Sequence, residues 1–313
     1  MEVFHGIEAV QKKFKNPAIT IGNFDGVHMG HQALFQRVKQ WAGELNGESI
    51  VVTFDPHPLE VLFPEKAPLF ITSHRQKLDL IARCGIDATI VIPFDHEFSQ
   101  MSAREFVKVI LVDKIGTRAI VVGHDYRFGH SREGDIPFLR KLGQQYGFEV
   151  EIVTAIKMNH TPVSSTSIRR MIAKGDVSEA NRLLGRPFEV GGIVIEGRKR
   201  GVKLGFPTAN IRMQGVASPR TGVYVIEAEV DGKTYEGAAN LGYNPTFGDA
   251  ELSLEAHLFD FNQDIYGKYI TIRFIDRLRD EKRFSGPEEL RAQIQKDIDT
   301  ARKILAGLKA GKA

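Results

Sequence analysis

Apolar runs alternate with amphipathic stretches along the first part of the chain, up to about residue 185. The first apolar run covers residues 18–22, and apolar side chains then recur at Leu34, Val38, Trp41 and Leu45, a spacing that predicts one face of a helix. The same order repeats, with strands predicted at 49–54, 88–94, 119–123 and 148–153 and helices at 76–84, 103–113 and 137–146. Strands that alternate with helices predict an α/β fold whose parallel sheet is covered on both faces.

Short alternating segments replace this pattern after residue 186. Two of them cover residues 222–230 and 269–275, and the Asp231-Gly232 pair directly after the first predicts a tight hairpin turn. Such segments predict an antiparallel barrel or sandwich. The chain ends on a helical stripe formed by Leu290, Ile294, Ile298, Ala301, Leu305 and Leu308, with Pro287 near its start. We therefore expect two domains, 1–185 and 186–313.

Composition narrows the class of protein. The 313 residues are 42% hydrophobic and 26% charged, which is typical of folded soluble proteins. Basic and acidic residues nearly balance, 22 against 21 up to Gly185 and 20 against 18 after it, so neither half is a basic arm for nucleic acid. No signal-peptide core or membrane-spanning run is found, and the single Cys84 cannot form an intramolecular disulfide. We expect a cytoplasmic protein with no membrane or nucleic-acid partner, and its oligomeric state stays open.

A glycine-rich turn carries the first candidate chemistry. It follows the first predicted strand, opens the first predicted helix and reads GNFDGVHMGH. Gly22, Gly26 and Gly30 allow the backbone to approach phosphate oxygens, and a helix N-terminus offers free N–H groups and a positive dipole. His28 and His31 are three residues apart, so both can point at one anion. The alternatives are an ordinary turn with two surface histidines, or a metal site that lacks an evident third ligand.

Three further segments lie near the ends of predicted elements in the same half. FDPHP starts at Phe54, and its prolines stiffen a turn that could hold a flat ring. GHDYRFG supplies Asp125 and Arg127, and VSSTSIRR places hydroxyls near a helix start together with Arg169 and Arg170. Each alone could be an ordinary capped turn. Because the carboxyl ends of parallel strands meet at one edge, their joint placement predicts a single site.

The second half carries a basic glycine loop at 197–205 followed by PTAN. Free N–H groups and the charges of Arg198, Lys199, Arg200 and Lys203 suit a polyphosphate. Thr208 and Asn210 offer hard oxygens for Mg²⁺. Further along, the alternation of Leu254, Ala256 and Leu258 sends Glu255 and His257 to the opposite face, where the carboxylate could accept a proton from a substrate hydroxyl. The alternatives are a solvated basic loop and an exposed glutamate on an edge strand.

The motifs of the first half resemble a known family. The turn G-x-F-D-G-x-H-x-G-H, with FDPHP, GHDYRFG and SSTSIRR in that order, resembles the nucleotidyltransferase module of prokaryotic bifunctional FAD synthetases, over about residues 19–170. The resemblance implies a Rossmann-like fold of the HxGH type and adenylyl transfer from ATP to FMN. The residues that it implies for ATP are Gly22, Asn23, Phe24, Asp25, Gly26, His28, Gly30, His31, Ser165, Thr166 and Arg169, and those for the flavin are Phe54, Pro56, Pro58, Asp125 and Arg127.

Within that set, the resemblance assigns the catalytic role to His28, His31 and Arg169, which would stabilise the phosphates during transfer. The chain departs from the family at Ser167, where many relatives carry Arg. A second phosphate contact at that position is therefore not expected.

The motifs of the second half resemble the riboflavin kinase module over about residues 187–308. They are GFPTAN, GVY, NLGYNPTF, LEAHLFDF, DIYG and RLRDEKRF. The resemblance implies a mostly-β, six-stranded barrel with a C-terminal helix and Glu255 as the base on the ribityl 5′-hydroxyl. The residues that it implies for ATP are Gly192, Gly197, Arg200, Lys203, Gly205, Pro207, Thr208 and Asn210, of which Thr208 and Asn210 would also bind Mg²⁺, and those for the flavin are Asn240, Glu255 and Arg279.

Taken together, these patterns predict two enzymes in one chain. The second half would phosphorylate riboflavin to FMN with Mg²⁺ and ATP, and the first half would adenylylate FMN with a second ATP to give FAD and pyrophosphate. Two other hypotheses stay open. One is a riboflavin kinase whose first half is non-catalytic or acts on another acceptor, and the other is a flavin carrier without turnover.

Overall fold

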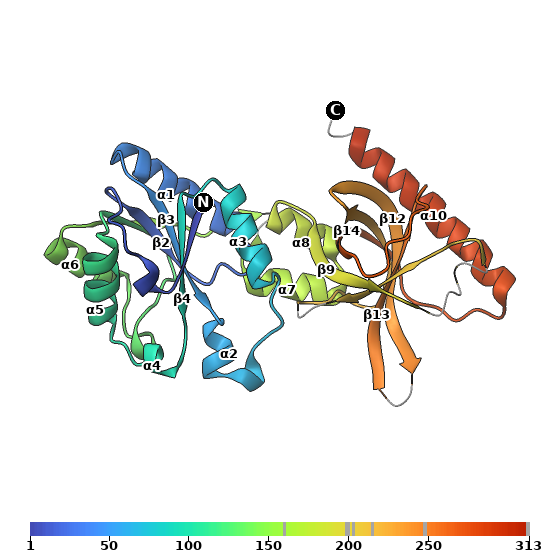
Figure 1. The fold of residues 1–313 in the computed structure, drawn as a ribbon, viewed down its shortest axis with the longest axis horizontal. Helices are drawn as coiled ribbons and strands as arrows, with labels where there is room; N and C mark the ends of the chain where they lie inside the picture. The colour runs from blue at the N-terminus through green and yellow to red at the C-terminus, as the bar shows by residue number, and fades with distance from the viewer. Residues whose placement is uncertain (159–160, 198–200, 202–203, 214–215, 247–248, 311–313) are drawn as a thin grey trace. The chain divides into compact units, whose positions relative to one another are not determined.

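A computed structural model describes residues 1–158, 161–197, 201, 204–213, 216–246 and 249–310 (Figure 1). The chain divides into two compact units. The first unit contains Met1–Pro68 and Thr72–Ser165, and the second contains Leu69–Ile71 and Thr166–Ala313. The short segment Leu69–Ile71 joins the second unit because Phe70 pairs with Val216 and accepts a hydrogen bond from the backbone N–H of Ala217 at 2.7 Å.

The first unit is built on a six-stranded parallel sheet in the order β1-β4-β3-β2-β5-β6. Its strands are β1 Glu2–His5, β2 Ala18–Ile21, β3 Ser49–Asp55, β4 Ala88–Pro93, β5 Ala119–Gly123 and β6 Glu149–Val153. The predicted parallel sheet and five of its strands are confirmed. β1 was not predicted, because its four residues are mostly exposed and carry no clear periodicity.

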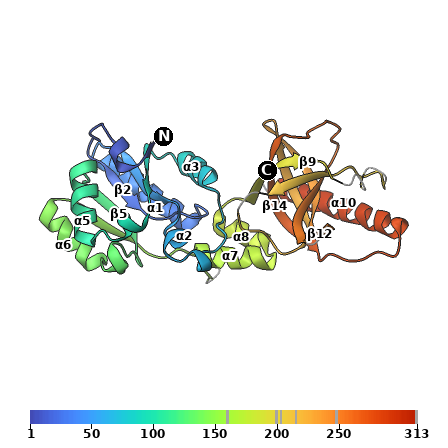
Figure 2. The same ribbon diagram turned by 60° about the horizontal axis from the view of Figure 1, so that its bottom comes forward.

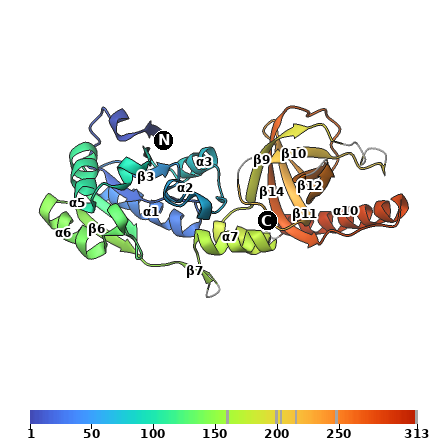
Figure 3. The same ribbon diagram turned by 90° about the horizontal axis from the view of Figure 1, so that it is seen from below.

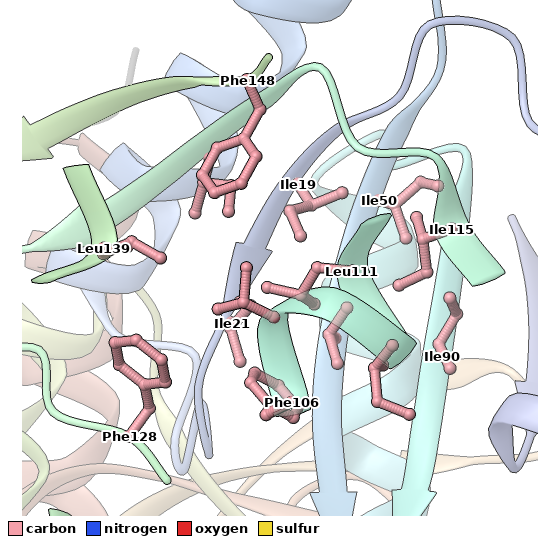
Figure 4. Close-up of a cluster of buried hydrophobic side chains, with 14 of the residues drawn as sticks. Ile19, Ile21, Ile50, Ile90, Phe106, Leu111, Ile115, Phe128, Leu139 and Phe148 are labelled. Atoms are coloured by element: carbon pink, nitrogen blue, oxygen red, sulfur yellow. The ribbon is translucent and has the colours of Figure 1, made fainter. Parts of the chain in front are cut away.

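Helices cover both faces of this sheet. The helices of this unit are η1 Ile7–Ala9, α1 Met29–Glu44, α2 Pro58–Leu62, η2 Pro64–Lys66, α3 His74–Arg83, α4 His96–Ser99, α5 Ala103–Glu105, η3 Phe106–Ile115, η4 His130–Arg132 and α6 Ile136–Tyr146. On one face, Val38 of α1 packs against Ala18 and Val121. On the other, Phe106 and Leu111 of η3 pack against isoleucines of the central strands (Figure 4).

The stretch predicted as one helix at 103–113 is a single α-helical turn followed by the π-helix η3. Sequence periodicity does not distinguish these forms over so short a run. A short pair, β7 Lys157–Met158 and β8 Thr161–Pro162, follows β6.

The second unit is a closed antiparallel barrel in the order β10-β13-β12-β11-β14-β9. Its elements are α7 Ser165–Lys174, which begins at the last residue of the first unit, α8 Val177–Leu184, β9 Phe188–Ile195, β10 Ala209–Met213, β11 Gly222–Val230, β12 Lys233–Thr246, β13 Asp249–Leu258, β14 Tyr269–Arg279 and α10 Pro287–Ala310. The antiparallel barrel is confirmed. The predicted hairpin is also confirmed, since Val230 pairs with Lys233 while Asp231 and Gly232 have φ of 49° and 75°.

Helix α8 packs onto the barrel through its side chains. The amide of Asn181 donates to the carbonyl of Phe274 at 2.8 Å and accepts from the N–H of Phe188 at 2.6 Å. The compact units therefore divide at Ser165, earlier than the change of sequence texture at Gly185. That change marks where the barrel strands begin, while the two helices before it already belong to the barrel unit. The functional division 1–185 and 186–313 stays a prediction.

The C-terminal helix α10 lies along the barrel, as Figures 2 and 3 show from two further directions. Ile298, Ala301 and Leu305 are buried against it, which confirms this part of the predicted stripe, whereas Leu308 is exposed and its predicted membership is wrong. An ion pair fixes the helix to β14: Arg279 Nη2 lies 2.7 Å from Asp297 Oδ2, and Arg279 Nε lies 3.1 Å from both carboxylate oxygens. Asp297 is only 8% exposed, so this pair is largely shielded from solvent.

We expect Asp297→Ala to loosen α10 from the barrel by about 2 kcal/mol, because it leaves the Arg279 guanidinium without its partner in a shielded place. Native-state hydrogen exchange of α10 peptides should then be roughly 30-fold faster. The control is Asp299→Ala on the same helix, where the exposed carboxylate accepts from the amide of Gln295 at 2.9 Å. Equal exchange in the two variants would contradict the prediction.

Candidate active sites

The first candidate site lies at the carboxyl end of β2. This strand lies between β3 and β5, where the strand order of the sheet reverses. Open parallel sheets bind ligands beyond the carboxyl ends of their strands at such a reversal. The loop from Gly22 to His28 follows β2 there, and α1 begins at Met29.

Contacts inside the unit hold this loop in a strained shape. Phe24, Gly26 and Val27 have φ of 52°, 81° and 39°, in the left-handed region. The N–H of Gly26 donates to Thr72 Oγ1 at 3.1 Å, and the N–H of Thr72 donates to Asp25 Oδ1 at 3.3 Å. The Phe24 ring and the Asp25 carboxylate are buried in the interior of the unit. At these two residues it is therefore the backbone of the loop, not the side chains, that is left to contact a ligand.

His28 and His31 lie together at the start of α1. His28 is the N-cap: its Nδ1 accepts from the N–H of His31 at 3.3 Å. The two rings stack with centroids 3.5 Å apart and an interplanar angle of 19°. Gly30 leaves room for this stack, because a Cβ there would lie 3.1 Å from the His28 ring. His28 is 5% exposed, so the alternative of two incidental surface histidines does not fit.

Burial, and secondly the neighbouring His28, lower the pKa of His31 well below its ordinary value. His31 is therefore neutral at neutral pH, and its imidazole carries no fixed positive charge. Its Nδ1 is buried without a hydrogen-bond partner among the described residues. Within the same residues, no three His, Cys, Asp or Glu side chains gather as a metal site would need.

The other predicted residues of this half lie on neighbouring strand ends. Phe54, near the end of β3, packs against Phe94 and Phe98 with ring centroids 5.8 and 6.1 Å away. The Asp55–Pro56 peptide is cis, and α2 begins at Pro58.

The remaining predicted site residues of this half lie after β5 and at the start of α7. Asp125 and Arg127 are exposed after β5, and Arg127 Nη1 lies 3.8 Å from Asp135 Oδ2. Ser165 Oγ donates to the carbonyl of Asp25 at 2.9 Å, which brings Ser165 to the glycine-rich loop. Thr166, Ser167 and Arg169 follow on α7, in the second unit.

Lys77, which the sequence patterns did not single out, lies on the buried side of α3 with Leu80 and Ile81. It is 7% exposed, and burial lowers the pKa of its ammonium group. The available signal was its spacing: 77, 80 and 81 form the start of an apolar stripe in which one member is charged.

The second candidate site follows from the register of three barrel strands. Glu255 of β13 lies directly opposite Asn210 of β10 on one side and Asn240 of β12 on the other. Paired residues of antiparallel strands point to the same face, here the face opposite the buried Leu254 and Ala256. The predicted outward orientation of Glu255 is thus confirmed by the burial of its neighbours, and two amides flank it.

The PTAN segment is fixed to the same strand. His257, two residues from Glu255, donates from Nδ1 to the carbonyl of Pro207 at 2.7 Å. Two glycines leave room around the predicted magnesium ligands: a Cβ at Gly197 would lie 2.0 Å from Asn210 Nδ2, and one at Gly201 would lie 3.3 Å from Thr208 Oγ1.

Among the described residues, the remaining predicted site residues of the second half do not contact Glu255 or the PTAN segment in any interaction described above. Gly192 pairs with Met213 in the barrel, and a Cβ there would lie 2.3 Å from the Arg212 carbonyl oxygen. Gly205 has a φ of 85°. Arg279 makes the ion pair with Asp297 described above. Arg198, Lys199, Arg200 and Lys203 lie outside the described residues.

Comparison with known proteins matches each half of the chain to a family. The FAD synthetase family matches residues 10–167, and the riboflavin kinase family matches residues 184–305. A bifunctional riboflavin kinase/FMN adenylyltransferase from Pseudomonas fluorescens is 40% identical over 307 residues, which cover 98% of each chain. The chain belongs to this bifunctional family.

Other relatives agree in length and fold. The riboflavin kinase/FMN adenylyltransferase of Escherichia coli K12 is 38% identical over 306 residues, covering 97% of this chain and 98% of the relative. A solved structure titled as a macrolide-efflux protein from Streptococcus pneumoniae is 30% identical, with a TM-score of 0.88 over 96% of this chain and 99% of that one. Within the described ranges, none of the helices combines the length and apolar character needed to cross a bilayer.

As a riboflavin kinase/FMN adenylyltransferase, the protein phosphorylates riboflavin to FMN and adenylylates FMN to FAD, with ATP as the substrate of both steps. The prediction of two enzymes in one chain is confirmed. The two open hypotheses, an inactive first half and a carrier without turnover, are not supported.

The low pKa of His31 makes the first unit sensitive to acid. The unfolded chain takes up a proton at His31 below about pH 6.5, whereas the folded chain does not, so stability falls with decreasing pH by about 1.4 kcal/mol per unit in that window. Urea unfolding followed by fluorescence of Trp41, the one tryptophan of the chain, reports on this unit. Between pH 6.5 and 5, we expect His31→Gln to lose roughly 1–2 kcal/mol less than the parent protein.

The control for this measurement is His96→Gln, which replaces an exposed histidine of the same unit. It should keep the parent's dependence on pH. A parent-like slope in His31→Gln would contradict the prediction.

Proposed function

We propose that the two sites described above divide the two reactions, with riboflavin phosphorylated at the β10–β13–β12 face and FMN adenylylated at the loop after β2. The observation that carries this proposal is the register that sets Glu255 between Asn210 and Asn240 on one face of the barrel. A carboxylate flanked by two amides on rigid strands has the placement that a general base needs.

In the kinase step, Glu255 accepts the proton of the riboflavin 5′-hydroxyl. The hydroxyl oxygen attacks the γ-phosphorus of ATP, and the bond from that phosphorus to the β-phosphate oxygen breaks to release ADP. Asn240 and Arg279 would lie on the flavin side, and the glycine loop with Gly197, Arg200 and Lys203 on the phosphate side. These assignments rest on the family resemblance of the motifs.

The donor set of this site fits Mg²⁺. Thr208 and Asn210 supply neutral oxygens, and Glu255 is the neighbouring carboxylate. No acidic cluster that could hold the ion by itself occurs among the described residues, so Thr208 and Asn210 would hold it together with phosphate oxygens of ATP. When bound, Mg²⁺ neutralises charge on the β- and γ-phosphates. The hydrogen bond from His257 to the carbonyl of Pro207 fixes the position of the next residue, Thr208.

In the adenylylation step, a phosphate oxygen of FMN attacks the α-phosphorus of ATP and pyrophosphate leaves. The attacking phosphate is already ionised, so this step needs no protein base, only charge stabilisation and positioning. We assign that work to His28, His31 and the free N–H groups at the start of α1.

The remaining assignments of this site follow the motifs. Gly22, Asn23, Gly26 and Gly30 would let the backbone approach the phosphates, and Ser165, Thr166 and Arg169 would hold the β- and γ-phosphates. Phe54, Pro56, Pro58, Asp125 and Arg127 would contact FMN. We also propose that the enzyme works in the cytoplasm, where Cys84, which forms no disulfide, stays reduced.

The test of the kinase assignment is Glu255→Gln, which keeps the size of the side chain but cannot accept a proton. Incubation with riboflavin, ATP and Mg²⁺, resolved by chromatography, should show FMN formation reduced about 100-fold or more, while FAD formation from supplied FMN is unchanged. The matched control is Glu227→Gln on β11, which should behave as the parent. Normal FMN formation in Glu255→Gln would overturn the assignment.

For the adenylylation site, the variant is His28→Asn with His31→Gln. Asn is a good N-cap, so α1 keeps its start while both imidazoles are lost. We expect FAD formation to fall about 100-fold or more and FMN to accumulate, because charge on the transferring phosphates loses its donors. Trp41 fluorescence checks that the unit is folded. Parent-like FAD formation would show that the histidines are bystanders.

A further inference from the structure

Lys77 is a buried cation at the edge of the adenylylation site. It lies on α3 and is 7% exposed, whereas lysine is almost never this buried unless its ammonium is paired. Its Nζ donates to the carbonyl of Phe54 at 3.1 Å and to Thr53 Oγ1 at 3.3 Å. Both acceptors belong to the carboxyl end of β3. A methionine would fill the same space without the free-energy cost of burying a charge. The ammonium group must therefore have a role beyond packing.

The hydroxyl of Thr53 extends this contact to the neighbouring strand. Thr53 is fully buried, and its Oγ1 donates to the carbonyl of Asn23 at 3.4 Å. A hydroxyl has one proton to donate and two lone pairs, so it can accept from Lys77 and donate to Asn23 at once. Through this single side chain the ammonium reaches the loop that ends at His28, the N-cap of α1.

The surrounding charges favour this arrangement. The carboxylates of Asp55, Asp25 and Glu60 oppose the effect of burial on the Lys77 pKa. Asp25 belongs to the loop after β2, and Asp55 follows Phe54 on β3. The cation is thus influenced by acidic groups from two strand ends: that of β3, which it contacts directly, and that of β2, which it reaches through Thr53.

We propose that Lys77 is a positioning residue for FMN adenylylation. Its ammonium holds the loop after β2 and the Phe54–Pro58 turn at a fixed separation, so that the α-phosphorus of ATP and the phosphate of FMN meet in line. This inference rests on the proposed assignment of those two segments to ATP and to the flavin. A displacement of about 1 Å between two reacting groups is enough to cost roughly 100-fold in rate.

The central test compares Lys77→Met with the parent protein. We expect kcat/KM for FAD formation from FMN to fall about 10- to 100-fold, with KM raised for both ATP and FMN, while FMN formation from riboflavin is unchanged. The matched control is Lys39→Met. Lys39 is an exposed lysine of α1 that also donates to a backbone carbonyl, that of Cys84 at 3.0 Å, and its replacement should leave both activities unchanged.

Thr53 tests the route by which the ammonium acts. Thr53→Val removes the hydroxyl and should reproduce part of the loss, whereas Thr53→Ser restores the hydroxyl and most of the activity. Combined with Lys77→Met, Thr53→Val should add little, because both changes break one chain of hydrogen bonds. Effects that simply multiply would overturn the route through Thr53.

The outcomes separate this inference from the proposed function. Parent-like KM and kcat in Lys77→Met overturn the positioning role even if the His28→Asn, His31→Gln variant is inactive. If that histidine variant is itself fully active, the assignment of the site fails first. Should Lys77→Met fail to fold by Trp41 fluorescence, the Thr53→Val and Thr53→Ser pair decides: equal activity in the two overturns the inference, and loss in Val alone supports it.

Discussion

The proposed adenylylation site depends on the burial of β2 between β3 and β5. Because both neighbours run parallel to it, the chain must leave β2 at an edge where backbone N–H and C=O groups lose their strand partners. Side chains from two distant segments, Thr72 and Ser165, form hydrogen bonds with the backbone of the loop from Gly22 to His28. The last residue of the loop, His28, caps the helix that follows. The same bonds that satisfy the loop also fix its shape, which is what phosphate transfer by positioning requires.

In the barrel, the positions of the proposed site residues are fixed by strand register rather than by a loop. Its key residues lie on strands, and the alternation of side chains decides which face each one occupies. A slip of one residue in β13 would turn Glu255 into the barrel interior and Leu254 outward, so the apolar core enforces the position of the carboxylate. Stability and the proposed chemistry are coupled directly in this unit, since the residues that fill the core and those assigned to the kinase site alternate along one strand.

Sequence patterns predicted those features that depend on near neighbours. Apolar runs predicted five strands of the parallel sheet, and the Asp231-Gly232 pair predicted the hairpin between β11 and β12 of the barrel. The alternation of apolar residues predicted on which face of β13 Glu255 lies. Features that depend on distant residues were not predictable in this way. The burial of Phe24 and the role of Lys77 depend on contacts with segments tens of residues away. Arg279 shows the same limit: its motif implies a flavin contact, while Asp297, on another element, determines its ion pair.

The segment Leu69–Ile71 has a consequence for how the enzyme is divided. It belongs to the barrel unit, although the chain before and after it belongs to the sheet unit. The backbone therefore passes from one unit to the other at three points along the chain rather than at one. No single cut of the backbone therefore yields two complete units. A fragment that begins at Thr166 lacks the residue that pairs with Val216, and one that ends at Ser165 keeps a segment without its partner.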